Sequence, residues 1–483
     1  MAQTQTSNEG PSNSDWRSGR KIRRLPEMLL RDERNHHDYI PKMVSIGPYH
    51  HGKAELRFGE SFKSVLLEDM LKVAGEEADN RWLEKIAEQI TEIRNCYEEG
   101  STDMYDDDQL ALMMLLDASF ITFNILLYLI HASGNIAVNM AEYLSLGRDH
   151  VDRMHDHFGE LSLSMALRDI CLVDNQIPLW IVELLLSRIT PGDEAQILTG
   201  YAYLVLFGKS YSAEIQIPEW ADGDKDMLHV FELLYCILAL VVHEPEEETR
   251  SSHVNCCFSA KERTNIDLES GECCRGVRKF SFARVCKCRL FKKAKGDLKI
   301  LGHSFRSLTE LKAKGIHLKP SLTQSLLDVK FKSNFMYAEL QLPTLSACLD
   351  TKTLLLNMMC IELDANFRTL GVVISYINLM KSLIVKPDDV KELREKKILL
   401  GLLGSDEEIV KMYHNFDTHG ANNPSIYDEV KDSIQAHYDS KTKTWMAELI
   451  HTYFRSPWTF ITLLAATCLL VLTILQTVYT MKS

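Results

Sequence analysis

The chain has 483 residues, of which 46% are hydrophobic and 25% charged, so it can bury a large core in one irregular body or in two or three domains. Its net charge of −13 argues against a general binder of nucleic acid or of anionic lipid, although a local basic patch can still act. The N-terminus is polar and has no apolar stretch, so we expect no secretory signal peptide and a disordered segment over residues 1–20.

Residues 22–52 are rich in proline and glycine, which predicts an extended, turning segment. Within it, residues 47–53 (GPYHHGK) have the spacing of a nucleotide-binding P-loop. Ala54 stands where that motif requires a Mg²⁺-binding Ser or Thr, and Gly59 interrupts the helix that should follow. A packed, hydrogen-bonded turn is therefore favoured over a phosphate site, and also over a metal site at the paired histidines.

Helical periodicity predicts helices over residues 60–74 and 79–99, followed by a long apolar helix over 110–130. The third is long enough to cross a membrane. Asp117 near its centre costs about 3 kcal/mol in lipid, and Asn124 adds to that cost. We therefore expect a helix of the protein core, with a membrane span as the alternative.

Residues 170–189 are apolar apart from the motif Asp174-Asn175-Gln176-Ile177-Pro178. The proline breaks or kinks a helix, and the three polar side chains can satisfy the backbone groups that the break leaves unpaired. We expect a structural joint here; a ligand-binding break is the alternative. A further apolar helix is predicted over residues 225–243.

Residues 249–297 differ from the rest of the chain. Ten basic residues and one acidic residue lie between Arg275 and Lys299. Six of the 12 cysteines fall in the same region, at Cys256, Cys257, Cys273, Cys274, Cys286 and Cys288. Their spacing lacks the C-x2-C pairs of zinc modules, so a variable surface loop is favoured over a zinc site or a basic patch for anionic lipid or nucleic acid.

The pattern then changes to short β-like runs. We predict strands over residues 316–318, 326–331 and 336–342, and helices over 351–363 and 370–383 with further ones beginning near Pro387 and at the cap residue Ser405. Residues 445–454 have apolar faces at helical spacing and lead into the last segment of the chain.

That last segment, residues 457–481, contains no charged side chain. The 22 residues from Trp458 to Tyr479 span about 33 Å as a helix, which matches the hydrocarbon thickness of a bilayer, and the two aromatic residues suit its interfaces. We predict a transmembrane helix that contacts membrane lipid through Trp458–Tyr479, with residues 1–456 in the cytosol; the opposite topology stays open. The membrane could be the plasma membrane or the endoplasmic reticulum.

The expected fold is mainly α: an irregular helical body with a small β-containing portion in its C-terminal half, plus one C-terminal transmembrane helix. The expected division is a disordered N-terminus (1–20), an N-terminal helical region (21–248), a variable basic Cys-rich loop (249–297), a C-terminal α+β part of the same body (298–455) and the transmembrane helix (456–480).

Several motifs resemble the plant family catalogued as domain of unknown function 247. They are residues 25–26 (LP), 39–41 (YIP), 44–52 (VSIGPYHHG), 174–178 (DNQIP), 310–315 (ELKAKG), 388–390 (DDV) and 456–458 (SPW). Asp174 stands where the family is expected to have Glu. The resemblance implies a mostly helical, membrane-associated plant protein without established enzymatic activity. Some grass members resemble pollen-side determinants of self-incompatibility, and recognition specificity would then lie in variable parts such as residues 254–295.

The sequence thus favours a membrane-anchored protein that acts in recognition or signalling through an unidentified protein partner. No catalytic, cofactor-binding or metal-binding residue is assigned, and no cofactor, nucleic acid or small-molecule substrate is expected, because no intact P-loop, dinucleotide fingerprint, G-x-S-x-G or H-E-x-x-H motif is present. The alternative is an enzyme with a novel site, which a pocket gathering His50, His51 or Asp174 with a nucleophile would favour. Regulation of nucleic acid through the basic loop is a third reading.

Overall fold

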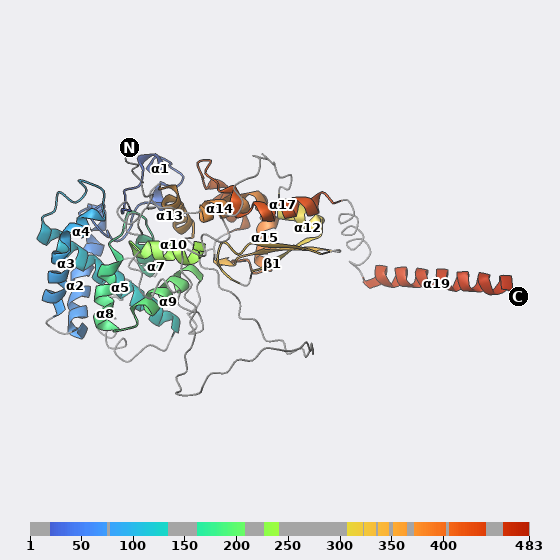
Figure 1. Cartoon of the computed structure of the whole chain (residues 1–483), viewed down its shortest axis with the longest axis horizontal. Coiled ribbons are helices and arrows are strands. Elements are labelled where there is room, and N and C mark those ends of the chain that lie inside the picture. The colour runs from blue at the N-terminus through green and yellow to red at the C-terminus, as the bar shows by residue number, and fades with distance from the viewer. Residues whose placement is uncertain are drawn as a thin grey trace, which may run out of the picture. The chain divides into compact units, whose positions relative to one another are not determined.

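The structure is a computed structural model of the whole chain, and all the residues described here belong to the unit formed by residues 1–242 and 301–483 (Figure 1). The described residues are 20–74, 78–133, 162–207, 227–240, 307–321, 323–334, 337–346, 351–364, 371–401, 405–440 and 457–482. The expectations for residues 1–19, for the basic Cys-rich loop and for the helix over 445–454 lie outside these residues.

The N-terminal half is helical and is organised around one buried helix, α5 (Asp107–Ser133), which packs against α2, α3, α8 and α9. Its elements are α1 (Glu27–Leu30), η2 (His36–Asp38), η3 (Ala54–Leu56), α2 (Arg57–Ala74), α3 (Ala78–Glu88), α4 (Ile90–Asn95), α7 (Ser162–Ile170), α8 (Leu179–Ile189), α9 (Glu194–Phe207) and α10 (Val230–Leu240). α5 is apolar around most of its circumference, which suits a helix with neighbours on several sides.

The long apolar helix is therefore a core helix, as predicted. Of its most apolar stretch, Asp107–Leu129, 89% is buried inside the body. The helix expected over residues 79–99 differs: it is divided into α3 and α4, because Gln89 leaves the helical conformation. Trp82, Ile86 and Ile93 still lie in the core, so the predicted apolar face is correct.

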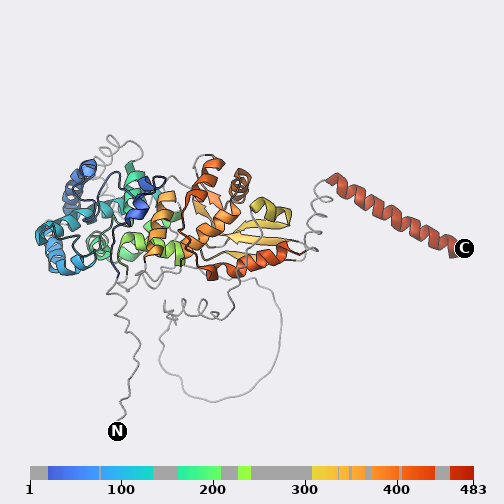
Figure 2. The same ribbon diagram turned by 90° about the horizontal axis from the view of Figure 1, so that it is seen from above.

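The C-terminal half contains a three-stranded mixed sheet in the order β1-β3-β2 (Figure 2). Its strands are β1 (Ile316–Pro320), β2 (Lys330–Ser333) and β3 (Ala338–Leu342), with β1 parallel and β2 antiparallel to β3. A second, two-stranded parallel pair joins β4 (Leu345–Ser346) and β5 (Leu399–Leu400). The strand expected over residues 326–331 begins only at Lys330, because Asp328 closes a turn on Thr323.

The C-terminal half also contains the helices α12 (Leu308–Ala313), α13 (Thr351–Leu363), α14 (Val372–Leu383), α15 (Pro387–Glu395), α16 (Asp406–Asn415) and α17 (Asp428–Tyr438), with the turn η6 (Pro424–Ile426) before the last. Of these, α12 packs against β1 and α17 against β2. Ser405 caps α16 as predicted, since its hydroxyl accepts from the Glu408 N–H at 3.3 Å. Pro387 opens α15, where its missing N–H leaves no bond unmade. Buried residues of both halves form one continuous core.

The chain ends in α19 (Pro457–Lys482), a helix of 26 residues. Its most apolar stretch, Leu464–Met481, is not buried at all against the rest of the chain. Leu469, Leu470 and Leu472 each expose at least 60% of their surface. By length and composition this helix and α5 are the two in the described residues that are able to cross a membrane, and they differ completely in burial.

Candidate functional site

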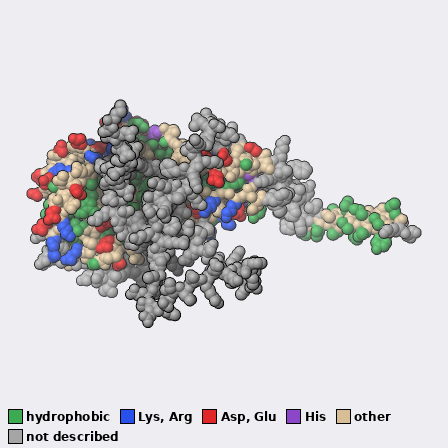
Figure 3. Space-filling view, in the orientation of Figure 1, with side chains coloured by type: hydrophobic (Ala, Val, Ile, Leu, Met, Phe, Trp, Pro, Cys, Tyr) green, Lys and Arg blue, Asp and Glu red, His purple; other side chains and the backbone are tan. Residues whose placement is uncertain are grey.

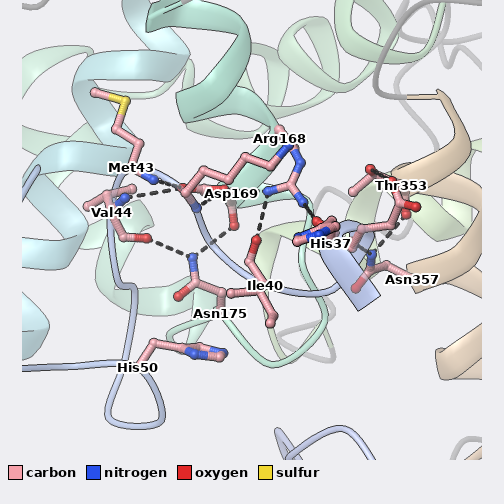
Figure 4. A network of polar contacts seen from close by, with 12 residues as sticks. His37, Ile40, Met43, Val44, His50, Arg168, Asp169, Asn175, Thr353 and Asn357 are labelled. Atoms are coloured by element: carbon pink, nitrogen blue, oxygen red, sulfur yellow. Dashed lines mark hydrogen bonds and ion pairs between the residues drawn. The ribbon is translucent and has the colours of Figure 1, made fainter. Parts of the chain in front are cut away.

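The two motifs 44–52 and 174–178 meet at a buried polar joint, which we define as residues 42–47 together with the side chains that bind their backbone (Figure 4). Residues 43–50 are buried, yet 42–47 belong to no helix or strand. Their six consecutive N–H groups all donate to side chains: Lys42, Met43 and Val44 to Asp169 at 2.7–3.1 Å, Ser45 to Glu60 at 3.3 Å, Ile46 to Asn175 at 2.7 Å and Gly47 to Asp117 at 2.6 Å. The joint thus replaces the backbone pairing that buried peptide groups need.

Asp169 is the main acceptor of the joint. It lies in the last turn of α7 with its side chain wholly buried, and Arg168 donates to it at 2.9 Å. Arg168 also donates to the carbonyl of Ile40 at 2.9 Å and to that of His37. Burial raises the pKa of the Asp169 carboxyl to about 6, against the lowering by its backbone donors and by Arg168. One arginine–aspartate pair therefore fixes the chain before and within the joint.

A second buried ion pair joins α2 to α5 beside it. Lys63 Nζ lies 2.5 Å from Asp117 Oδ1, and both side chains are 1% exposed. The ammonium also donates to the Ser45 carbonyl at 2.7 Å and to Glu60 at 2.8 Å. Burial raises the pKa of Asp117 to about 6, and Lys63 acts in the opposite direction. Asp117, which the sequence marked as an unfavourable interruption of an apolar helix, is held by these partners.

The motif at 174–178 supplies the amides of the joint. Asn175 Nδ2 donates to the carbonyls of Val44 at 3.2 Å and Asp169 at 2.9 Å. Gln176 Nε2 donates to the carbonyls of Ile170 and Leu172 at 2.6 and 2.8 Å, which have no helical partner once α7 has ended. The break is thus the structural joint that the sequence predicted.

Gly47 shows how closely the two motifs approach each other. Its φ is +75°, and a Cβ there would lie 2.4 Å from the carbonyl oxygen of Gln176. Because that neighbour is backbone, a side chain has no space at this position. In the segment that resembles a P-loop, the Gly47 N–H donates to Asp117 and the Lys53 N–H donates to the His50 carbonyl, in agreement with the packed turn expected for residues 47–53.

His50 and Asp174 are brought together, whereas the enzyme alternative required a pocket that gathers such residues with a nucleophile. The His50 Nε2 lies 3.0 Å from Asp174 Oδ1, and the Lys53 ammonium donates to His50 Nδ1 at 2.7 Å. An ammonium can only donate, so Nδ1 is the acceptor and Nε2 carries the proton toward Asp174. Both ring nitrogens have a hydrogen-bond partner, and His50 as a whole residue is 7% exposed. His51 lies apart from this pair, with its Nδ1 3.6 Å from Glu60.

Asn357 on α13 ties the joint to the C-terminal half of the body (Figure 4). Its Oδ1 accepts from the Val173 N–H at 3.0 Å, and its Nδ2 donates to the carbonyls of Asp38 at 3.1 Å and Thr353 at 2.8 Å. It is wholly buried. Sequence reasoning missed Asn357, Asp169 and the partner of Asp117, since a single buried polar residue on an apolar helix does not reveal which distant backbone it binds.

The described residues contain no group of three His, Cys, Asp or Glu side chains placed to hold a metal ion. The cysteines at 256–288, for which a zinc site was considered, lie outside them. A cavity between α7, α9 and α13 is lined mainly by apolar side chains, among them Leu167, Val205 and Leu355. Neither His50 nor Asp174 lines it. The hydrogen bonds of the joint hold residues 44–52 and residues 174–178 together.

The fold is a mostly helical body, with two sequence motifs that meet at one buried joint and an exposed apolar helix at the C-terminus. The chain belongs to the family DUF247, described as "Plant protein of unknown function", whose model matches residues 22–472. The resemblance seen in the sequence is therefore confirmed.

Two relatives in Arabidopsis thaliana match over most of the chain. "Putative UPF0481 protein At3g02645" is 22% identical over 501 aligned residues, covering 91% of this chain and 86% of the relative. "UPF0481 protein At3g47200" is 25% identical over 470, covering 94% and 85%. No solved structure matches the chain.

Proposed function

We propose that this protein is anchored in a membrane by α19 and that its body acts by binding other macromolecules, without catalysing a reaction. The observation that carries the proposal is the exposed apolar surface of α19. Its 26 residues span about 39 Å, enough to cross the roughly 30 Å of hydrocarbon in a bilayer. Eleven of its large apolar side chains are exposed, and moving them into lipid gains on the order of 10 kcal/mol or more.

The polar residues of α19 are compatible with lipid. The hydroxyls of Thr473 and Thr477 donate to backbone carbonyls four residues earlier, each at 2.7 Å. A hydroxyl bonded within its own helix has little left to lose on leaving water. Lys441, Lys443 and Arg455 precede the helix and Lys482 is its last residue, which supports a cytosolic body by the positive-inside bias.

Membrane insertion is tested by carbonate extraction of the full chain expressed in plant cells. We expect it to stay in the pellet, and the variant lacking residues 457–483 to become soluble. A sharper test compares two double variants. One carries Leu470→Arg and Leu472→Arg, and the other carries Leu470→Phe and Leu472→Phe. Each arginine near the helix centre costs about 2.5–3.5 kcal/mol in lipid, so the arginine pair should be extracted to a larger extent than the phenylalanine pair. Extraction of the unaltered chain would contradict the anchor.

A binding role is better supported than catalysis centred on His50 and Asp174. The buried pair is engaged at both ring nitrogens, which leaves no nitrogen for a substrate proton. A His50→Gln variant distinguishes the two roles. If the body acts by binding, the folded variant should retain any partner captured by proximity labelling. If His50 is catalytic, the folded variant should lose turnover.

Recognition between pollen and pistil is the specific role that the family resemblance suggests. The segment where specificity would lie, residues 254–295, is outside the described residues, and the proposal for it rests on the sequence alone. The test is an exchange of residues 254–295 with those of a relative, followed by proximity labelling in pollen. A changed set of partners is expected. The same partners with either segment would argue against this role.

A further inference from the structure

The three-stranded sheet has one face turned toward the core and one turned outward. Ile316, Leu318, Ala338, Leu340 and Leu342 point inward and are buried. The opposite face carries two cross-strand rows, His317–Glu339–Lys332 and Lys319–Gln341–Lys330. Its outer residues on β1 and β2 are exposed and its central ones half-buried. We call these six residues the basic sheet face.

This face is locally positive in a chain whose net charge is −13. It holds three lysines and one carboxylate. Lys319 pairs loosely with Glu339 at 3.7 Å, and Lys330 contacts Asp328 at 2.5 Å. Lys332 has no ion-pair partner among the described residues. In Figure 3, Lys and Arg side chains gather over the region where Figure 1 labels β1.

The chain leaves the body for α19 from one end of this sheet. His437, in the last turn of α17, has its Nδ1 2.9 Å from the Ser333 hydroxyl at the end of β2 and its Nε2 3.2 Å from the Lys314 carbonyl before β1. The row that contains His317 and Lys332 lies at that same end. Tyr337, 41% exposed, lies beside His317 there.

The link from α17 to α19 is short. α17 ends at Tyr438 and α19 begins at Pro457, so 18 residues connect them. Fully extended, they reach about 60 Å, and any turn shortens that. A membrane that holds α19 is thus always within reach of this end of the sheet, which gives the bilayer surface a high effective concentration.

We propose that the basic sheet face binds anionic phospholipid headgroups of the bilayer in which α19 is inserted. The proposal rests on the membrane anchoring proposed above. Lysine ammonium groups are strongly hydrated point charges that suit a fluid layer of phosphate and carboxylate groups without a fixed geometry. An exposed tyrosine beside them suits the interfacial region. An acidic protein is the competing occupant, but the tether favours the surface that is always near.

The test uses the full chain reconstituted in phosphatidylcholine nanodiscs, with or without phosphatidylserine. Lysines are acylated with a water-soluble reagent and read by mass spectrometry. Phosphatidylserine should protect Lys319 and Lys332, and raising the salt concentration should remove the protection because it screens the charges. Lys85 on α3 and Lys391 on α15, both exposed, should react equally in all samples.

A matched pair of variants sharpens the result. Lys319→Gln with Lys332→Gln should lower the ratio of docked to undocked protein by about fivefold for each lysine, read at Lys330, while Lys85→Gln with Lys391→Gln should leave it unchanged. Equal reactivity with and without phosphatidylserine would overturn the proposal, as would protection that appears only with an acidic protein. Loss of anchoring is a separate outcome, because the chain would then fail to enter even pure phosphatidylcholine nanodiscs.

Discussion

The polar joint and the basic sheet face both gather charged side chains, but they differ in burial and in pairing. In the joint, Asp169, Arg168, Lys63 and Asp117 are at most 4% exposed as side chains, and each has several partners. On the sheet face the lysines are exposed, and Lys319 and Lys330 each have a single ion-pair partner. Buried, fully bonded charges specify a structure, whereas exposed ones remain available to a partner.

The difference teaches where function should be sought in this family. Of two motifs that identify the chain, residues 44–50 of the first and residues 174–178 of the second are buried at or beside the joint. The surface that we propose to meet the membrane carries no such motif. Sequence signatures therefore mark the parts that hold the body together, and the interacting surfaces have to be found from exposure and charge.

Removal of the joint's main acceptor should have the largest effect. Asp169→Ala leaves three backbone N–H groups and Arg168 buried without their acceptor, which costs about 3–5 kcal/mol in the free energy of unfolding. The matched control is Asp388→Ala at an exposed position of α15, where a loss within about 1 kcal/mol is expected. Urea denaturation measures both. Similar losses in the two variants would remove the distinction between the joint and the surface.

Gly47→Ala tests the contact between the two motifs. The new methyl group would lie 2.4 Å from the Gln176 carbonyl, so the backbone must shift, and we expect a loss of about 3 kcal/mol in the free energy of unfolding. Gly52 is the control: its φ is +80°, but nothing lies within 4 Å of the position of a Cβ. Gly52→Ala should cost only about 1 kcal/mol for the left-handed conformation. Thermal denaturation measures both variants. An equal decrease in melting temperature would show that the two motifs are farther apart at Gly47 than described.

Acid should weaken the body through His229. Its buried Nδ1 accepts from the Glu232 N–H at 3.1 Å, and burial lowers the pKa of His229 to about 3. Because the pKa of His229 is lower in the folded chain, the unfolded chain binds the proton at a higher pH. The stability that His229 contributes is therefore complete above about pH 6.5, and it is lost at roughly 1 kcal/mol per pH unit as the pH falls toward 3.

His229→Asn keeps an acceptor for the Glu232 N–H and removes the titration. Stability is measured by denaturation of both chains from pH 7 to pH 4. The difference between them isolates His229, because the carboxyls whose pKa values are raised, Asp117 and Asp169, occur in both. The unaltered chain should lose more stability in acid than the variant. If stability depended on pH in the same way in both chains, this would argue against a buried, unprotonated His229 Nδ1.

The smallest effect is expected on the sheet face. Lys319→Gln with Lys332→Gln should change the free energy of unfolding by no more than about 0.5 kcal/mol, because exposed lysines contribute little to folding. Thermal denaturation of the full chain in neutral detergent checks this. A loss comparable with that of Asp169→Ala would place these lysines in the structure and erase the contrast between the two regions.

Periodicity was enough to predict most helices. It identified α13 at Thr351–Leu363 with the observed bounds, and the burial of α5 followed from the cost of Asp117 in lipid. It missed α1, α7, α9, α12 and α17. The described part of α9 is almost wholly apolar, so it has no polar face to set a period, and α17 buries little beyond Ile434 and His437.

The site was predictable only in part. The break at residues 174–178 was expected to satisfy local backbone, which Gln176 does. That Asn175 also binds Ile46 and Val44, 129 and 131 positions away, depends on the tertiary fold. The basic sheet face could not be predicted without the cross-strand register. Its lysines come from two strands, β1 and β2, and their order in the sequence does not show that they share one face.

The bond between Asn357 and the Asp38 carbonyl joins positions 319 residues apart. A ribosome adding about 5–20 residues per second needs on the order of half a minute to make that stretch. The side chains that accept from the six amide donors of residues 42–47 lie between Glu60 and Asn175, so the donors wait for them during the first part of this time, and Asn357 follows last. The nascent chain should therefore depend on holding chaperones more than a protein of this size built from local contacts, and codon changes that slow synthesis between these positions should increase its degradation.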